Sequence, residues 1–193
     1  RSVRPLFPEH MRLDVQLSAV AMSFDGMNDT DILVMNGASM ALAISDIPWA
    51  GPIGAVRVGR VEDKFVLNPT LEEQSLSNMD LVVAGKKGAI MMVESGAQEL
   101  SEDIFLEALA LASKEIDRLC DLQVDVVKRI GKAKFDVPAP VIDAELSKRV
   151  NDMARPGLKD ALRIAEKSAR EKAISTLKKE VKTKLAEAFP DKG

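Results

Sequence analysis

The sequence of 193 residues contains one cysteine, one histidine, one tryptophan and no tyrosine. The single thiol, Cys120, excludes an internal disulfide framework and is typical of a reducing compartment. It falls on the apolar side of an expected helix, so we predict a buried thiol rather than a reactive one. His10 lies in a polar turn with no second histidine or cysteine nearby, which indicates a surface residue rather than a metal ligand. A lone histidine also leaves no Ser-His-Asp or Cys-His set for nucleophilic catalysis.

The chain also lacks an apolar run long enough to span a membrane, a signal peptide and an initiator methionine. We therefore expect a cytoplasmic protein without membrane contact, and a fragment of a longer chain. The net charge of −3 conceals an uneven distribution, because residues 1–131 carry 12 basic and 20 acidic side chains and residues 132–193 carry 15 and 10. A basic segment attached to an acidic body favours a polyanionic partner, although a solvated helix face also explains such a run.

The stretch Ser45–Gly59 joins a helical pattern to a strand pattern. Pro48 and Pro52 fit neither a helix interior nor a central strand, so they bracket a loop that holds the only tryptophan, Trp49. The glycines at 51, 54 and 59 indicate a bulge or the close approach of a neighbouring element. They do not follow the G-x-G-x-x-G spacing between a strand and a helix, which argues against a dinucleotide site.

Apolar periodicity predicts the order of elements before residue 132. Alternation from Leu13 to Ser23 predicts a strand with one buried face, and helical spacing predicts a helix from Thr30 or Asp31 to Ile44. Two strands rich in apolar residues follow later and indicate central strands covered on both faces. The further expected elements are strands Ile53–Val61 and Lys64–Leu67, a short helix Leu71–Leu76, strands Met79–Ala84 and Ala89–Val93, and a long helix Ser101–Gly131.

Prolines at 138 and 140 predict an extended linker over residues 132–140. Beyond it, amphipathic patterns predict helices at Ile142–Met153, Leu158–Glu166 and Arg170–Phe189, with a break at Arg155–Gly157. Three such helices can just bury one another, and the pattern stops early, so we expect an incomplete bundle. The predicted domains are a body of residues 1–131, the linker 132–140 and an all-α domain of residues 141–193.

Five motifs occur in the order in which polynucleotide phosphorylases carry them, namely Arg1–Pro8, Asn36–Ser39, Ser45–Gly59, Phe65–Thr70 and Asp80–Gly85. The chain resembles that family over essentially its whole length, most strongly as far as about residue 131. The resemblance implies an α+β fold: a ribonuclease PH-like (ribosomal protein S5 domain 2-like) sheet-and-helix domain followed by a small all-α helical domain. It identifies the chain as the later part of the first, non-catalytic ribonuclease PH-like domain and most of the helical linker domain.

The resemblance also implies a function for the intact protein. Members of the family are phosphate-dependent 3′-to-5′ exoribonucleases, or polyribonucleotide nucleotidyltransferases, that act in mRNA degradation. It implies Mg²⁺ as cofactor, phosphate as co-substrate and single-stranded RNA as partner. It further implies a homotrimeric ring and possible partners in RNA-degradation complexes. A free-standing RNA-binding or assembly module without an enzyme attached is the alternative.

Arg1 and Arg4 are the candidate RNA-binding residues. On a helical turn this spacing places both guanidinium groups on one side, where planar forks can clamp phosphate oxygens. Spacing alone favours an ordinary pair of surface arginines. The resemblance favours a functional pair, because arginines at these positions of the family motif R-x-x-R-P-L-F-P lie near the RNA path.

Catalytic residues and metal ligands are not expected in this chain. The family's second, catalytic domain holds magnesium with two aspartates in the pattern D-x-x-x-x-x-D-x-K, and the lysine assists phosphorolysis. By the landmark D-x-V-V-A-G these positions correspond here to Gln74, Asp80 and Val82. One carboxylate beside a neutral amide and an aliphatic side chain cannot hold magnesium, so the resemblance implies a non-catalytic copy.

Overall fold

The computed structural model describes residues 1–139, 141 and 143–189. By its contacts the chain divides into a first unit, Arg1–Pro138, and a second unit, Ala139–Gly193. Within the part of the chain that is described, no helix is both long enough and apolar enough to cross a membrane.

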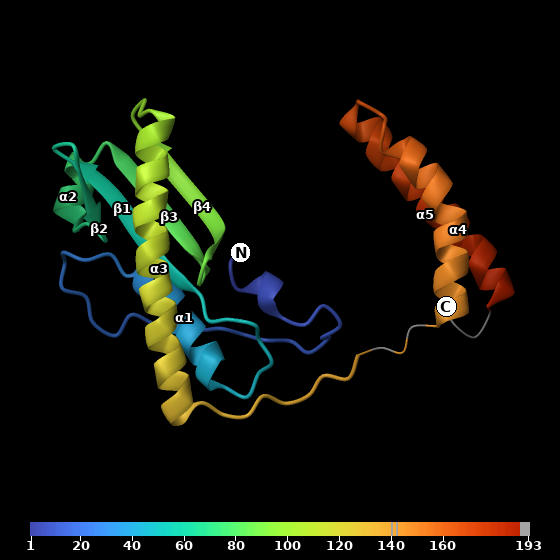
Figure 1. The fold of residues 1–193 in the computed structure, drawn as a ribbon, viewed down its shortest axis with the longest axis horizontal. Helices are drawn as coiled ribbons and strands as arrows, with labels where there is room; N and C mark the ends of the chain where they lie inside the picture. The colour runs from blue at the N-terminus through green and yellow to red at the C-terminus, as the bar shows by residue number, and fades with distance from the viewer. Residues whose placement is uncertain (140, 142, 190–193) are drawn as a thin grey trace. The chain divides into compact units, whose positions relative to one another are not determined.

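A four-stranded antiparallel sheet forms the centre of the first unit, with strand order β2-β1-β3-β4 (Figure 1). Tight turns join both hairpins: Glu62 and Asp63 adopt positive φ between β1 and β2, and Gly88 does so between β3 and β4. The mixed sheet-and-helix architecture confirms the predicted α+β class. The elements are α1 (Asp31–Ile44), β1 (Gly54–Val61), β2 (Lys64–Leu67), α2 (Leu71–Leu76), β3 (Met79–Lys86), β4 (Ala89–Ala97) and α3 (Glu102–Ile130).

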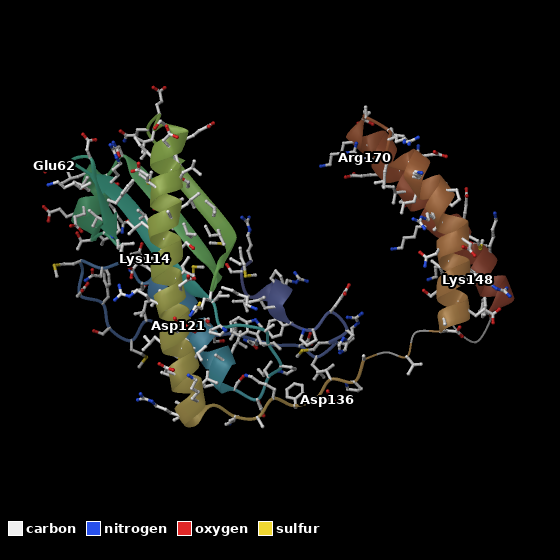
Figure 2. The ribbon with its side chains drawn as sticks, in the orientation of Figure 1. Glu62, Lys114, Asp121, Asp136, Lys148 and Arg170 are labelled. Atoms are coloured by element: carbon white, nitrogen blue, oxygen red, sulfur yellow. The ribbon has the colours of Figure 1, made fainter. Side chains whose placement is uncertain are left out.

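Helix α3 lies across one face of the sheet (Figure 1). Successive strand residues point to opposite faces, and the buried Val58 and Leu81 pack against Ala112 and Ile116 of this helix. A β-carbon at Gly54 would lie 3.0 Å from the Ile116 carbonyl oxygen, so the missing side chain lets helix and strand approach closely. Cys120, on the same helix, is buried as predicted. The next residue of α3, Asp121, is labelled in Figure 2. It ties the helix to the β3–β4 hairpin, because Lys87 Nζ donates to its carboxylate at 2.7 Å.

Helix α1 packs on the opposite face of the sheet, where Ile32 meets Ala55 and Ala84. A buried hydrogen-bond network connects this helix with α3 and the start of β1. Ser39 Oγ donates to Gln123 Oε1 at 2.6 Å and accepts from the Ile53 amide at 2.9 Å. Gln123 Nε2 in turn donates to the Ile53 carbonyl at 2.7 Å. Each polar atom thus finds a partner within the core, as burial requires.

Trp49 fills the joint between α1 and β1, where it is buried with Leu42 and Ile53. Its ring lies so close to Gly51 that any β-carbon there would overlap it, at 2.0 Å from the nearest ring atom. The close approach predicted for this glycine-spaced stretch is therefore confirmed at Gly51 and Gly54.

Two strand predictions for the first unit are wrong. Residues Leu13–Ser23 form no strand, and Leu13 and Met22 expose 62% and 91% of their surface. Alternation makes a segment compatible with a sheet, but a strand also needs a neighbour with which to exchange backbone hydrogen bonds. Strand β4 exists but lies at the edge of the sheet, so Ile90 and Val93 are exposed rather than covered on both faces.

The start of the expected linker is held against the first unit. Lys132 N donates to the Ile44 carbonyl, and Lys134 Nζ donates to three carbonyls at the end of α1, those of residues 42, 43 and 45. Such contacts satisfy carbonyls that a helix C-terminus leaves unpaired. Further along, His10 Nε2 lies 2.9 Å from the Val137 carbonyl, so this histidine is half-buried and bonded rather than a free surface residue. The domain boundaries themselves stay a prediction.

The described residues of the second unit form two helices, α4 (Ala144–Ala161) and α5 (Lys167–Ala188). The predicted break at Arg155–Gly157 is wrong, because α4 continues through Pro156. Proline removes one backbone bond, but Gly157 packs directly against Leu177 of α5, so tertiary contact holds the helix there. Between residues 143 and 189 the structure has two helices where three were expected. Two residues of the predicted linker and first helix, Pro140 and Ile142, lie outside the described residues.

Candidate functional site

The segment that carries Arg1 and Arg4 is docked on the Trp49 loop. Arg4–Leu6 form a short 3₁₀ helix. The loop fixes two backbone carbonyl groups of this segment, one just before the helix and one on its last residue. Trp49 Nε1 donates to the Val3 carbonyl at 3.0 Å, and the Ala50 amide donates to the Leu6 carbonyl at 2.8 Å. The apolar side chains of the segment pack into the core, which leaves both arginines exposed.

Arg1 and Arg4 line one hollow of about 880 Å³. The structure thus brings the two candidate residues together, although Arg1 lies before the helical turn rather than on it. A third arginine, Arg12, lines the same hollow and was not identified from the sequence. Among the described residues none of these three side chains forms an ion pair. The sequence does place Arg12 just beyond the R-x-x-R-P-L-F-P motif. Spacing along the chain, however, does not show that the turn Pro8–Met11 brings Arg12 back to the hollow lined by Arg1 and Arg4.

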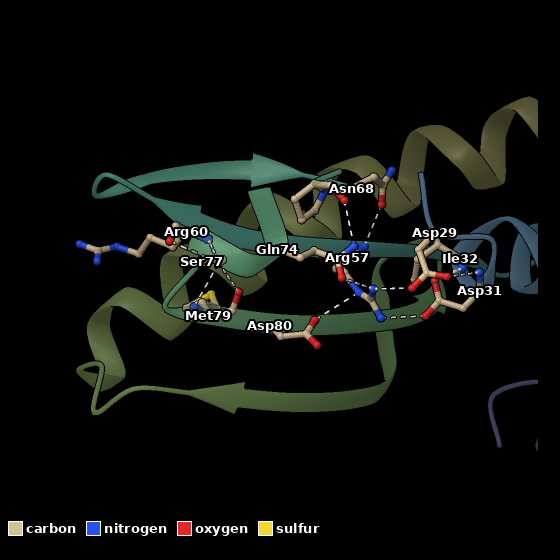
Figure 3. Close-up of polar contacts among 11 residues, drawn as sticks. Asp29, Asp31, Ile32, Arg57, Arg60, Asn68, Gln74, Ser77, Met79 and Asp80 are labelled. Atoms are coloured by element: carbon tan, nitrogen blue, oxygen red, sulfur yellow. Dashed lines mark hydrogen bonds and ion pairs between the residues drawn. The ribbon is translucent and has the colours of Figure 1, made fainter. Parts of the chain in front are cut away.

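A second polar cluster forms on the sheet face that α1 covers, and it includes Gln74 and Asp80. Its centre is the guanidinium group of Arg57 on β1 (Figure 3). Nη1 donates to Gln74 Oε1 at 3.0 Å, and Nε lies 3.2 Å from Asp80 Oδ1. The two polar side chains at the landmark positions, Gln74 and Asp80, therefore both face one positively charged side chain.

Two further carboxylates complete the cluster from the start of α1. Asp29 accepts from Arg57 Nη1 at 3.1 Å, and Asp31 accepts from Nη2 at 2.8 Å. The Arg57 side chain is only 12% exposed, whereas the carboxylates keep substantial contact with solvent. The guanidinium group thus donates hydrogen bonds through Nη1 and Nη2 to Asp29, Asp31 and Gln74, whereas Nε forms an ion pair with Asp80 without a hydrogen bond.

Local structure positions each member of the cluster. Thr70 and Glu73 form a capping box at the start of α2, which fixes that short helix behind β1. Gln74 Nε2 donates to the Pro69 carbonyl, and this bond directs the amide oxygen toward Arg57. Burial raises the pKa of Asp29, but hydrogen bonds from the Asp31 amide and the Arg57 guanidinium group outweigh burial and hold that pKa below its ordinary value.

Magnesium does not fit this cluster. Mg²⁺ requires several oxygen ligands in octahedral geometry, and here a fixed cation already lies between the available oxygens. The third landmark position, Val82, supplies no ligand. Within the described residues, no group of three or more histidine, cysteine, aspartate or glutamate side chains is placed to hold a metal ion.

Comparison with known proteins identifies the class of domain. Residues 51–115 match the family model described as "3' exoribonuclease family, domain 2", and this range covers the sheet and the first half of α3. The crystal structure of rice (Oryza sativa) Rrp46 is also similar, with 16% identity, a TM-score of 0.46 and coverage of 50% of this chain and 47% of that one.

The more specific similarity is to polyribonucleotide nucleotidyltransferases. The chain is 44% identical over 191 residues to that of Bacillus pumilus, 45% over 191 residues to that of Bacillus licheniformis and 42% over 191 residues to that of Bacillus subtilis. Each alignment covers 99% of this chain and 27% of the relative, so the chain spans about a quarter of the length of these curated proteins. The resemblance to a fragment of polynucleotide phosphorylase is thereby confirmed.

Proposed function

We propose that the chain is part of a phosphate-dependent 3′-to-5′ exoribonuclease, a polyribonucleotide nucleotidyltransferase that acts in mRNA degradation. The names of its relatives and its identity to them over nearly its whole length support this assignment. In this proposal the intact protein is cytoplasmic, assembles as a homotrimeric ring, uses phosphate as co-substrate and holds Mg²⁺ at a site outside this chain. It acts on single-stranded RNA and can join RNA-degradation complexes.

Within that protein, this portion is non-catalytic scaffold and a wall of the RNA channel. The observation that carries the non-catalytic role is the position of Arg57, whose guanidinium group contacts both Gln74 and Asp80. A positive side chain fixed between these groups repels a divalent cation and occupies its ligands. The body of residues 1–131 then serves as scaffold, and residues 141–193 serve as the helical linker domain beyond the linker 132–140.

The role in the channel wall rests on Arg1 and Arg4. Both are exposed, both line one hollow, and neither is neutralised by an ion pair within the described residues. Single-stranded nucleic acids are commonly tracked by positive side chains on their phosphates, with binding that weakens as salt rises. The pair is therefore suited to hold an RNA backbone without reading its sequence.

Two measurements test the proposal. The purified chain, incubated with poly(A), phosphate and Mg²⁺, is expected to release no nucleoside diphosphate, and measurable release would contradict the non-catalytic role. In the intact protein, Arg4→Asp is expected to weaken binding of long RNA and slow phosphorolysis, because it replaces attraction with repulsion. If RNA affinity is unchanged and only the melting temperature falls, Arg4 is a structural residue.

The alternative is a free-standing RNA-binding or assembly module. The uneven charge of the chain and the arginine hollow are compatible with it. The two proposals differ in the open reading frame, since an enzyme requires a further ribonuclease PH-like domain with the pattern D-x-x-x-x-x-D-x-K. Its absence from the intact frame would favour the module.

A further inference from the structure

The hollow lined by Arg1 and Arg4 has a second wall, formed by the turn Pro8–Met11 and the residues after it. Arg12 emerges from this turn, and its Nη1 donates to the Glu9 carbonyl at 2.9 Å. The same nitrogen also donates to the Met11 carbonyl at 3.5 Å, so these bonds use at most two of the five N–H donors of the guanidinium group. The side chain is therefore oriented by its own turn and is exposed to a ligand with most of its donors still available.

Both walls of the hollow are fixed to parts of the fold that lie far away in sequence. The Arg4 wall is held by Trp49 and Ala50, as described above. The Arg12 wall is held by the hydrogen bond between the Met11 amide and the Pro8 carbonyl at 3.0 Å and by the contact of His10 Nε2 with the Val137 carbonyl. Because the walls are held before a ligand arrives, less conformational entropy is lost on binding.

The polar side chains that line the hollow are all charged. They comprise the three arginines and the carboxylates Glu9 and Asp14, while the remaining lining is apolar. Among the described residues that line it, three arginines and two carboxylates leave a net charge of +1, and there is no amide or hydroxyl side chain. The chemistry suits a repeating anion, with guanidinium forks on phosphate oxygens, rather than a particular base.

We propose that Arg12 is a third contact to the phosphate backbone of single-stranded RNA, in the same hollow as Arg1 and Arg4. The inference rests on the proposed function, because it takes RNA as the ligand. Arg12 binds phosphate through its guanidinium group, and the Glu9 carbonyl sets the direction of that group. RNA thus lies between two fixed walls rather than along the R-x-x-R-P-L-F-P segment alone.

The test measures binding of fluorescein-labelled oligo(A) and oligo(U) to the intact protein over a salt series. For single strands the slope of log affinity against log salt changes by about 0.7 for each phosphate contact, so Arg12→Ala is expected to make the slope shallower by about 0.7 on both oligonucleotides. Arg12→Lys keeps the charge and is expected to keep the slope. Arg118→Ala is the matched control, because Arg118 is exposed on α3 and pairs only with Glu115. It is expected to change nothing.

The outcomes separate the inference from the proposed function. If Arg4→Ala makes the slope shallower and Arg12→Ala does not, the inference is overturned while the proposed function stands. If neither variant changes the slope, RNA does not occupy the hollow, and the inference fails together with the proposed role of Arg1 and Arg4 in the channel wall. A lowered melting temperature for Arg12→Ala with an unchanged slope shows that Arg12 only braces its turn, and a loss on one oligonucleotide alone shows base recognition. Either result overturns the inference.

Discussion

Replacement of Arg57 by methionine tests whether its positive charge stabilises the polar cluster that it forms with Asp29, Asp31, Asp80 and Gln74. Methionine keeps the length and apolar contacts of the side chain but removes every guanidinium donor. Three contacts to partly exposed carboxylates contribute about 0.5–1 kcal/mol each after solvent screening. The bond to the Gln74 amide adds about 0.5–1 kcal/mol, so we expect a loss of about 2–4 kcal/mol in the free energy of unfolding.

Urea unfolding followed by the fluorescence of Trp49 measures this loss, because the only tryptophan is buried in the same unit. Arg60→Met is the matched control. Arg60 lies on the same strand and has similar burial, but it pairs with one carboxylate, that of the exposed Asp63, so its loss is expected not to exceed about 1 kcal/mol. Equal losses of unfolding free energy in the two variants would refute the claim that Arg57 stabilises the fold through its three carboxylate contacts.

The pH dependence of this difference has a definite sign. The folded protein holds the pKa of Asp29 below its ordinary value, so the ionised group stabilises the fold above its ordinary pKa of about 3.9. That stability is lost as pH falls through the lowered pKa, because the carboxyl group becomes protonated. The difference between wild type and Arg57→Met should therefore be full near neutral pH and shrink below about pH 4. A difference that stays constant into acid would contradict a charge-based role.

Three further predictions concern stability and access. Ser39→Ala leaves the Gln123 side chain and the Ile53 amide without a hydrogen-bond partner in the core, so the free energy of unfolding should fall by about 2–3 kcal/mol. Ser18→Ala, at an exposed position, should lower it by less than about 0.5 kcal/mol in the same urea assay. Burial raises the pKa of Cys120, so iodoacetamide should modify this thiol only under unfolding conditions, and rapid labelling of the native chain would show that it is accessible. Limited proteolysis with thermolysin should cut first within residues 138–143, because hydrogen bonds hold residues 132–137 on the first unit and α4 begins at Ala144. First cuts inside α3 would show that the boundary between the two units is misplaced.

Turn residues and apolar runs made most of the first unit predictable. Glu62 and Asp63 end one run and Lys87 and Gly88 end another, and both pairs adopt the tight turns that join adjacent strands. Local chemistry also placed the long helix, with Ser101 before it and Gly131 after it. These features depend on a few neighbouring residues, so a single sequence contains them in full.

The predictions that failed all depended on a partner elsewhere in the chain. Alternation at Leu13–Ser23 has the correct period for a strand, but the structure provides no neighbouring strand for it. The run in β4 is as apolar as a central strand, yet the order of the sheet leaves it at an edge. Pro156 does not end α4 because a packed neighbour outweighs the lost backbone bond.

Residue types and their spacing were enough to predict the order of the helices and strands from residue 31 to residue 130, the resemblance to polynucleotide phosphorylases, and the presence of an amide at Gln74 and an aliphatic side chain at Val82. The fold was needed to show which side chains lie around Arg57, Arg4 and Arg12. Arg57 reaches Asp29 and Asp80 because α1 and β3 flank β1, and Arg12 joins Arg4 because a turn folds back. The physical reason is that hydrogen bonds and ion pairs act over a few ångströms in space, whatever the separation of the residues in sequence.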